Sequence, residues 1–187
     1  MSKPLSFYRT SSALRITPDI NRGVFWVDGA NPLPDAPKGI PEKGVQKFNW
    51  EEKLLIALSP DEALALAECA ETILRTREGK ASFFHDPKKG KLKTEAEPKT
   101  LTINVEKTDK GDPSTSSGHS ARVFLNLSQG GKRVAVVLGR SDLFAISTLI
   151  PYAVCAMWDW TGTLPQEESE RQEEPEPGYF DDDETPF

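Results

Sequence analysis

The sequence contains few of the residues that build disulfide frameworks or metal clusters. Of its 187 residues, two are cysteine, Cys69 and Cys155, and two are histidine, His85 and His119. Two cysteines cannot form such a framework, so we expect a reducing compartment and no metal site. No apolar run approaches the roughly 20 residues of a membrane-spanning helix, and no secretory apolar segment lies near the N-terminus. We therefore expect a soluble, cytoplasmic protein with no membrane partner.

Motifs for catalysis and nucleotide phosphate binding are also missing. The sequence has no Gly-x-Gly-x-x-Gly, and Lys89-Gly90-Lys91 lacks the other residues of a phosphate-binding loop. His119 lies in a stretch rich in glycine and serine, which is typical of a solvated loop. Both cysteines lie beside alanines in predicted helices, where they are expected to act as small apolar residues. We expect no catalytic residue and no cofactor, and hence not an enzyme.

Charge divides the chain into two parts. The net charge is −6, yet residues 165–187 alone carry ten acidic residues and one basic residue, which leaves residues 1–164 with a net charge of +3. The acidic part has no aliphatic side chain and cannot bury enough apolar area to fold, so it is expected to be disordered. We therefore expect a domain at 1–164 and an acidic protein-interaction tail at 165–187. The tail residues expected to bind a partner are Asp181, Asp182, Asp183, Pro186 and Phe187.

Short alternating segments followed by a helix occur twice in the domain, which indicates an α+β fold with antiparallel sheets. The first half predicts strands at Ala13–Thr17, Gly23–Val27 and Lys53–Leu58. A helix from Pro60 to about Arg75 follows, with Ser59 and Glu62 as its capping box. The second half predicts strands at Leu101–Val105, Arg122–Leu127 and Lys132–Leu138, with a hairpin turn at Gly130-Gly131. A helix that opens at Ser141 and kinks at Pro151 ends the domain, and loops are expected at Asn31–Gly44 and Lys107–Ser120.

The strands of the second half predict an outer face with an exposed aromatic ring. If Ile103, Val105, Val123, Leu125 and Leu127 face the core, then Thr102, Asn104, Arg122, Phe124 and Asn126 share the opposite face. An exposed phenylalanine between arginine and asparagine suits a nucleobase, whose stacking on an aromatic ring is worth about 1–3 kcal/mol. The alternative is that Phe124 packs under a helix or against a neighbouring subunit.

Aromatic and basic residues also alternate in three other stretches, which favours single-stranded nucleic acid over a merely solvated charged face. These stretches are Phe7-Tyr8-Arg9, Lys47–Lys53 and Phe83–Lys93. Together with the outer face they give the expected DNA contacts, which are Tyr8, Arg9, Phe48, Trp50, Lys53, Phe83, Phe84, Lys91, Asn104, Arg122, Phe124 and Asn126.

Four segments resemble the Whirly family of single-stranded-DNA-binding proteins: Lys47–Lys53, Ala57–Glu62, Phe83–Lys91 and Phe124–Ser128. The resemblance implies two antiparallel sheets packed crosswise with two helices, and a homotetramer that binds single-stranded DNA with little sequence preference. In that setting the helices, including Leu143, Ile146 and Ile150, form the oligomer core, and His85 and Asp86 shape a turn. The family's N-terminal Lys-Gly-Lys-Ala-Ala-Leu motif is replaced here by Arg9–Leu14, with Ser11 at the second lysine.

The last seven residues resemble the acidic C-terminus of bacterial and phage single-stranded-DNA-binding proteins, which recruits replication and repair enzymes. We therefore expect a bacterial or phage protein that coats and protects single strands in replication, recombination or repair. Its expected location is the bacterial nucleoid or the cytoplasm of an infected host cell. Two alternatives are a transcriptional regulator that binds promoter single strands, and an interaction scaffold that acts through its tail alone.

Overall fold

The chain forms two four-stranded antiparallel sheets, each followed by one helix. The computed structural model describes residues 3–36, 46–89, 96–108 and 120–159. The first half contains β1 (Leu5–Tyr8), β2 (Ala13–Asp19), β3 (Val24–Ala30), β4 (Leu54–Leu58) and α1 (Pro60–Thr76). The second contains β5 (Lys80–His85), β6 (Lys99–Thr108), β7 (Ser120–Gln129), β8 (Lys132–Leu138) and α2 (Arg140–Met157). The expected fold class is confirmed, with β1 and β5 added to the six strands that the sequence predicts.

Local sequence signals explain where both helices begin. The Glu62 backbone N–H donates to the Ser59 hydroxyl at 3.3 Å, and the Ser59 N–H donates to the Glu62 carboxylate at 2.9 Å, which completes the predicted capping box. Helix α2 begins slightly before the predicted Ser141, because the Asp142 carboxylate accepts from the Gly139 N–H at 2.7 Å. The helix continues through Pro151.

In the β7–β8 hairpin Gly130 has a φ of 57°, a left-handed conformation that favours glycine.

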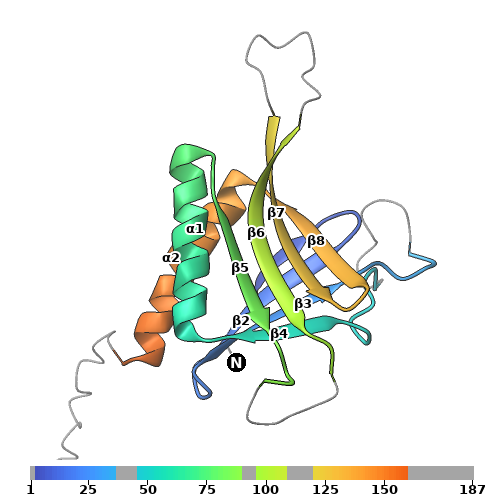
Figure 1. Ribbon diagram of the computed structural model, residues 1–187, viewed down its shortest axis with the longest axis horizontal. Helices are drawn as coiled ribbons and strands as arrows, with labels where there is room; N and C mark the ends of the chain where they lie inside the picture. The colour runs from blue at the N-terminus through green and yellow to red at the C-terminus, as the bar shows by residue number, and fades with distance from the viewer. Residues whose placement is uncertain (1–2, 37–45, 90–95, 109–119, 160–187) are drawn as a thin grey trace, which may run out of the picture.

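Both sheets and both helices contribute to one apolar core. Ile103, Leu125 and Leu127 are fully buried in it, Val123 is buried, and Val105 is half-buried against it, as the alternation predicts. Figure 1 shows α1 and α2 lying against each other, while the strands of the two sheets run in different directions. The inner face of each sheet is therefore largely buried, and the outer faces are left accessible to a ligand.

The free edge of β8 is covered by side chains from the first sheet. In this strand the carbonyls of alternate residues point away from β7, and three of them accept hydrogen bonds. The Asn31 amide donates to the Arg133 carbonyl at 3.2 Å, and the Ser12 hydroxyl donates to the Ala135 carbonyl. Arg9 Nε donates to the Val137 carbonyl at 2.7 Å. These bonds satisfy groups that would otherwise invite another strand, and they fix the two sheets to each other.

Arg9 was expected to contact DNA, but the structure places its guanidinium in this junction. Besides the Val137 carbonyl, it binds the Asp142 carboxylate at the start of α2. The reason is a long-range contact: residues 133 positions apart in the chain meet where β1 passes the end of β8. Arg9 therefore has a structural role in this junction, and its expected contact with DNA stays a prediction.

Candidate nucleic-acid interface

The outer face of the second sheet has the arrangement that the alternation predicts. In the β6–β7 register Asn104 lies opposite Phe124, Thr102 opposite Asn126, and Glu106 opposite Arg122. Arg122 is exposed and Phe124 is half-buried. An aromatic ring and a cation are thus accessible side by side on one sheet, as binding to an unpaired strand requires.

A chain of hydrogen bonds crosses this face and fixes its amides. Arg133 donates to Asn126 Oδ1, Asn126 Nδ2 donates to Asn104 Oδ1 at 3.0 Å, and Asn104 Nδ2 donates to Glu106 at 3.2 Å. Because the chain starts at a cation and ends at an anion, each amide has one defined orientation. Asn126 is only 9 % exposed, so it offers a ligand much less surface than its position on the outer face suggests.

The adjacent rings of β5 have opposite environments. Phe84 is 60 % exposed on the outer face, whereas Phe83 is 8 % exposed and belongs to the core. Consecutive residues of a strand point to opposite faces, so the two rings cannot share one surface. The expectation that Phe83 contacts DNA is therefore wrong, and Phe84 remains a candidate.

On the outer face of the first sheet, Phe48 is a packing residue. It is 6 % exposed and covers Ala13 and Ala30, which are buried beneath it. Tyr8 and Trp50 lie around it, with ring centroids 5.9 and 6.4 Å from that of Phe48. The direct contact expected of Phe48 is thus corrected: its ring supports the exposed Tyr8 and the half-buried Trp50.

A buried carboxylate organises the cations beside these rings. Asp28 is 4 % exposed and binds both Arg15 and Lys53, with Lys53 Nζ at 3.1 Å. The Arg15 guanidinium also lies over the Trp50 ring at 3.7 Å from its centroid. Lys53, an expected DNA contact, is therefore already paired. Arg15 was missed, although its position between the buried Leu14 and Ile16 is the signal that places it outside.

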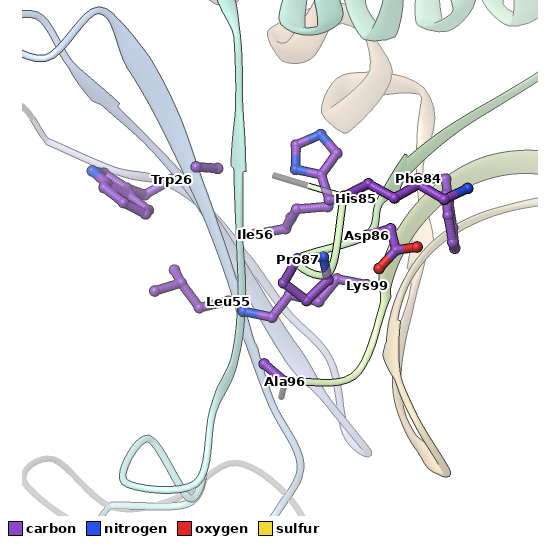
Figure 2. A pocket seen from close by; sticks show the side chains of 11 residues that line it. Trp26, Leu55, Ile56, Phe84, His85, Asp86, Pro87, Ala96 and Lys99 are labelled. Carbon is purple, nitrogen blue, oxygen red and sulfur yellow. The ribbon is translucent and has the colours of Figure 1, made fainter. Parts of the chain in front are cut away.

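A cavity of about 690 Å³ lies where the edges of the two sheets meet. Figure 2 shows Leu55 and Trp26 of the first sheet on one side of it and Phe84, with the Asp86–Pro87 turn after β5, on the other. Its lining is mostly apolar, and Lys89 and Lys99 provide positive charge. Trp26 is a second residue that sequence reasoning missed, although it alternates with the buried Phe25 and Val27.

His85 links this cavity to the start of α1. Its Nε2 lies 2.8 Å from Glu62 Oε1, so the capping carboxylate also holds the strand that ends at the turn. Asp86 shapes the turn after β5, because its carboxylate accepts from the Lys88 N–H at 3.0 Å, whereas His85 is the last residue of the strand. Burial alone would raise the pKa of Glu62, but hydrogen bonds from Ser59 and His85 and the charge of His85 lower that pKa below its ordinary value.

Other expected features fall outside what the structure describes. Lys91, His119 and the acidic tail at 165–187 are not among the described residues. Within the described residues, no group of three or more histidine, cysteine or acidic side chains is arranged to hold a metal ion. Over the same part of the chain, neither helix is long and apolar enough to cross a membrane.

Comparison with known proteins identifies relatives of this fold. The family model described as "Whirly transcription factor" matches residues 38–143. WHY3 from Arabidopsis thaliana aligns with a TM-score of 0.57 at 17 % identity, over 86 % of this chain and 91 % of that one. WHY1 from the same plant aligns with a TM-score of 0.56 at 16 % identity, over 90 % of this chain and 98 % of that one. The plant transcriptional regulator PBF-2 aligns with a TM-score of 0.53 at 16 % identity, over 86 % of this chain and 85 % of that one.

At these identities the structural matches establish a shared fold. A comparison with the sequences of curated proteins gave no match.

The lowered pKa of Glu62 predicts an acid-sensitive contribution to stability. A carboxylate with a lowered folded-state pKa stabilises the fold above its unfolded pKa, and this contribution is lost as the pH falls through the folded value. The unfolding free energy of the wild type should therefore exceed that of Glu62→Gln at pH 7, and the difference should shrink below pH 4.5, the ordinary value. Urea denaturation at several values between about pH 3 and pH 7, a range that includes the ordinary pKa of a glutamate, measures this difference. A difference that does not change with pH would contradict the assignment.

Proposed function

Because the chain belongs to the Whirly family, we propose that it binds single-stranded DNA across the outer faces of its two sheets, with little sequence preference. The observation that carries the proposal is the position of Phe84, a ring that is 60 % exposed beside an apolar cavity bordered by Lys89 and Lys99. A ring left in water on a β surface favours a flat partner, and every nucleobase offers one. Lysines beside it suit the phosphates of the same strand.

The other accessible rings extend this surface. Phe124 lies beside Arg122 on the second sheet, and Tyr8 and Trp50 lie beside Arg15 on the first. Stacking on rings does not distinguish strongly between bases, which supports binding that tolerates many sequences. We therefore assign the protein to the coating and protection of single strands in replication, recombination or repair. No catalytic step is part of this function.

The protein is further proposed to act as a homotetramer. The resemblance to the family placed Leu143, Ile146 and Ile150 in the oligomer core, but all three are buried inside the protomer. They face inward because α2 packs against α1 and the sheets. The opposite side of α2 exposes Phe144 and Tyr152 at 64 % and 68 %, and a helix face this apolar favours burial against a second copy.

The acidic tail is proposed to recruit replication and repair proteins in a bacterial or phage-infected cell. Its net charge of −9 opposes the +3 of residues 1–164, so the tail should also compete with DNA for the cationic surface. Binding of DNA displaces the tail in this scheme and presents its terminal aromatic residue, Phe187, to partners.

A second candidate function is that of a transcriptional regulator on promoter single strands. It is favoured by the family description and by the fixed amides of Asn104 and Asn126, which could read base edges. Oligonucleotides of random and defined sequence separate the two functions. A preference above about tenfold, or 1.4 kcal/mol, supports the regulator.

Replacing the exposed ring of β5 should weaken DNA binding. We expect Phe84→Ala to raise the Kd for a fluorescent dT oligomer by about 5- to 150-fold, the equivalent of one lost stacking contact of 1–3 kcal/mol. Phe84→Tyr, which keeps the ring, should bind like the wild type. Fluorescence anisotropy at low salt measures both, and the wild-type affinity should fall as salt rises. If the wild type does not bind at low salt, an interaction scaffold acting through its tail becomes the better explanation.

A charge on the exposed side of α2 should break the tetramer. Tyr152→Glu should give a smaller species than the wild type in light scattering, because an unpaired buried carboxylate costs several kcal/mol (on the order of 3–5) at an interface. Ile20→Glu, an equivalent change in the turn after β2, is the control and should leave the mass unchanged. A tetrameric Tyr152→Glu protein would place the interface elsewhere.

Removing the tail should separate its two proposed roles. A protein ending at Leu164 should bind the dT oligomer more tightly than the full chain at low salt, and equally at high salt, because screening removes the competition. Removing Phe187 alone should leave the affinity for DNA unchanged and abolish capture of the partner. Anisotropy and affinity capture measure these effects. Equal affinities with and without the tail at low salt would refute the competition.

A further inference from the structure

A second cavity of about 520 Å³ lies on the outer face of the first sheet. Arg15 and Trp26 line it, together with Thr17 and Leu55. It adjoins the cavity of Figure 2, because Trp26 and Leu55 line both. This site consists of two flat groups on neighbouring strands with an open space next to each.

The register of β2 and β3 places Arg15 and Trp26 next to each other on one face of the sheet. Arg15 lies opposite Asp28, and Trp26 lies opposite Thr17, so Arg15 and Trp26 are diagonal neighbours on one face. Diagonal neighbours in an antiparallel pair are about 7–8 Å apart. Stacked bases in DNA lie about 3.4 Å apart, so a base between two planes needs about 7 Å. The backbones of Arg15 and Trp26 are therefore about as far apart as the space that one inserted base requires, and the contacts of each side chain set the positions of the two planes.

Separate tethers keep the two groups from collapsing onto each other. The Arg15 guanidinium is held by Asp28 and covered on one side by Trp50. The indole Nε1 of Trp26 donates to Asp19 at 3.2 Å, and Asp19 lies two residues beyond Thr17, away from Arg15. Each plane is thus fixed by its own carboxylate before any ligand arrives, which lowers the ordering cost of binding.

The charges of the cavity favour a base over a phosphate. Its cations, Arg15, Arg22 and Lys53, face two carboxylates, since Asp28 binds Arg15 and Lys53 and Asp19 pairs with Arg22 at 3.8 Å. Cations already paired with carboxylates attract a phosphate weakly, whereas the flat surfaces of guanidinium and indole remain suited to stacking.

We propose that this cavity is a nucleobase subsite in which one base of the bound strand stacks between the guanidinium plane of Arg15 and the indole of Trp26. The subsite rests on the proposed binding of single-stranded DNA and specifies where one nucleotide is held. Asp28 and Asp19 act as positioning residues, because they hold the two planes apart.

The test compares a dT oligomer with an abasic oligomer of the same length, which keeps the phosphates and lacks the bases. Arg15→Lys keeps the charge and loses the plane, and Trp26→Leu loses the ring. Each should raise the Kd for the dT oligomer by about 5- to 100-fold and leave the Kd for the abasic oligomer unchanged within about twofold. Trp26→Phe should recover most of the affinity.

Matched controls separate this result from a loss of structure. Arg75→Lys makes the same exchange on α1, where Arg75 pairs with Glu71 at 3.7 Å, and should bind both oligomers like the wild type. Circular dichroism and light scattering on each variant establish that fold and assembly are retained. If Arg15→Lys and Trp26→Leu bind dT like the wild type, the subsite is wrong and the proposed function stands. Equal losses on both oligomers would show a phosphate site and overturn the assignment to a base. A wild type that does not bind dT would overturn the proposed function and the subsite with it.

Discussion

The burial of both sheets in a single apolar core determines which side chains can bind anything. Each strand has one face toward this core, so its binding residues must lie on the other face. Fully burying a residue such as Leu125 or Ile103 stabilises the fold by about 1.5–3 kcal/mol. A register slip of one residue would expose the whole inner row of a strand, at a cost far above the 1–3 kcal/mol or so that one stacked base returns. The core therefore fixes Phe124 outward, and the proposed binding of DNA uses the sheet faces that do not pack in the core.

This constraint explains which parts of the interface the sequence predicts. Alternation over β6 and β7 identifies both faces because the inner residues are aliphatic and the outer ones are polar, with Phe124 as the exception. The paired rings Phe83 and Phe84 carry no such contrast, so only the register of β5 shows which one is exposed. Phe48 precedes β4 outside any regular strand, and its burial over Ala13 and Ala30 depends on how the chain folds back.

The ion pairs of the arginines and lysines are harder to predict than the strands, because the sequence does not indicate which carboxylate a given cation binds. Arg9 binds Asp142, and Arg15 and Lys53 share Asp28, through contacts between residues 133, 13 and 25 positions apart. These pairs remove charge from the surface that a count of lysines and arginines assigns to phosphates. Each phosphate neutralised on a single strand contributes a salt slope of about 0.7. Stacking should therefore carry a larger share of the affinity than the +3 charge of residues 1–164 suggests.

The position of the helices relative to the sheets allows the proposed assembly and the proposed binding of DNA at the same time. The exposed rings Phe144 and Tyr152 belong to α2, whereas Phe84 and Phe124 belong to β5 and β7 and Trp50 precedes β4. Figure 1 shows α2 beside α1 and apart from the outer strands of the sheets. A copy bound through α2 therefore leaves the outer sheet faces accessible and brings further sheets near the same strand. In the proposed tetramer, binding of one protomer would raise the effective concentration of the next, so moderate stacking at each sheet would give tight binding overall. In this arrangement the affinity of the assembly does not require strong phosphate contacts, which agrees with the extensive pairing of Arg9, Arg15 and Lys53 within the protomer.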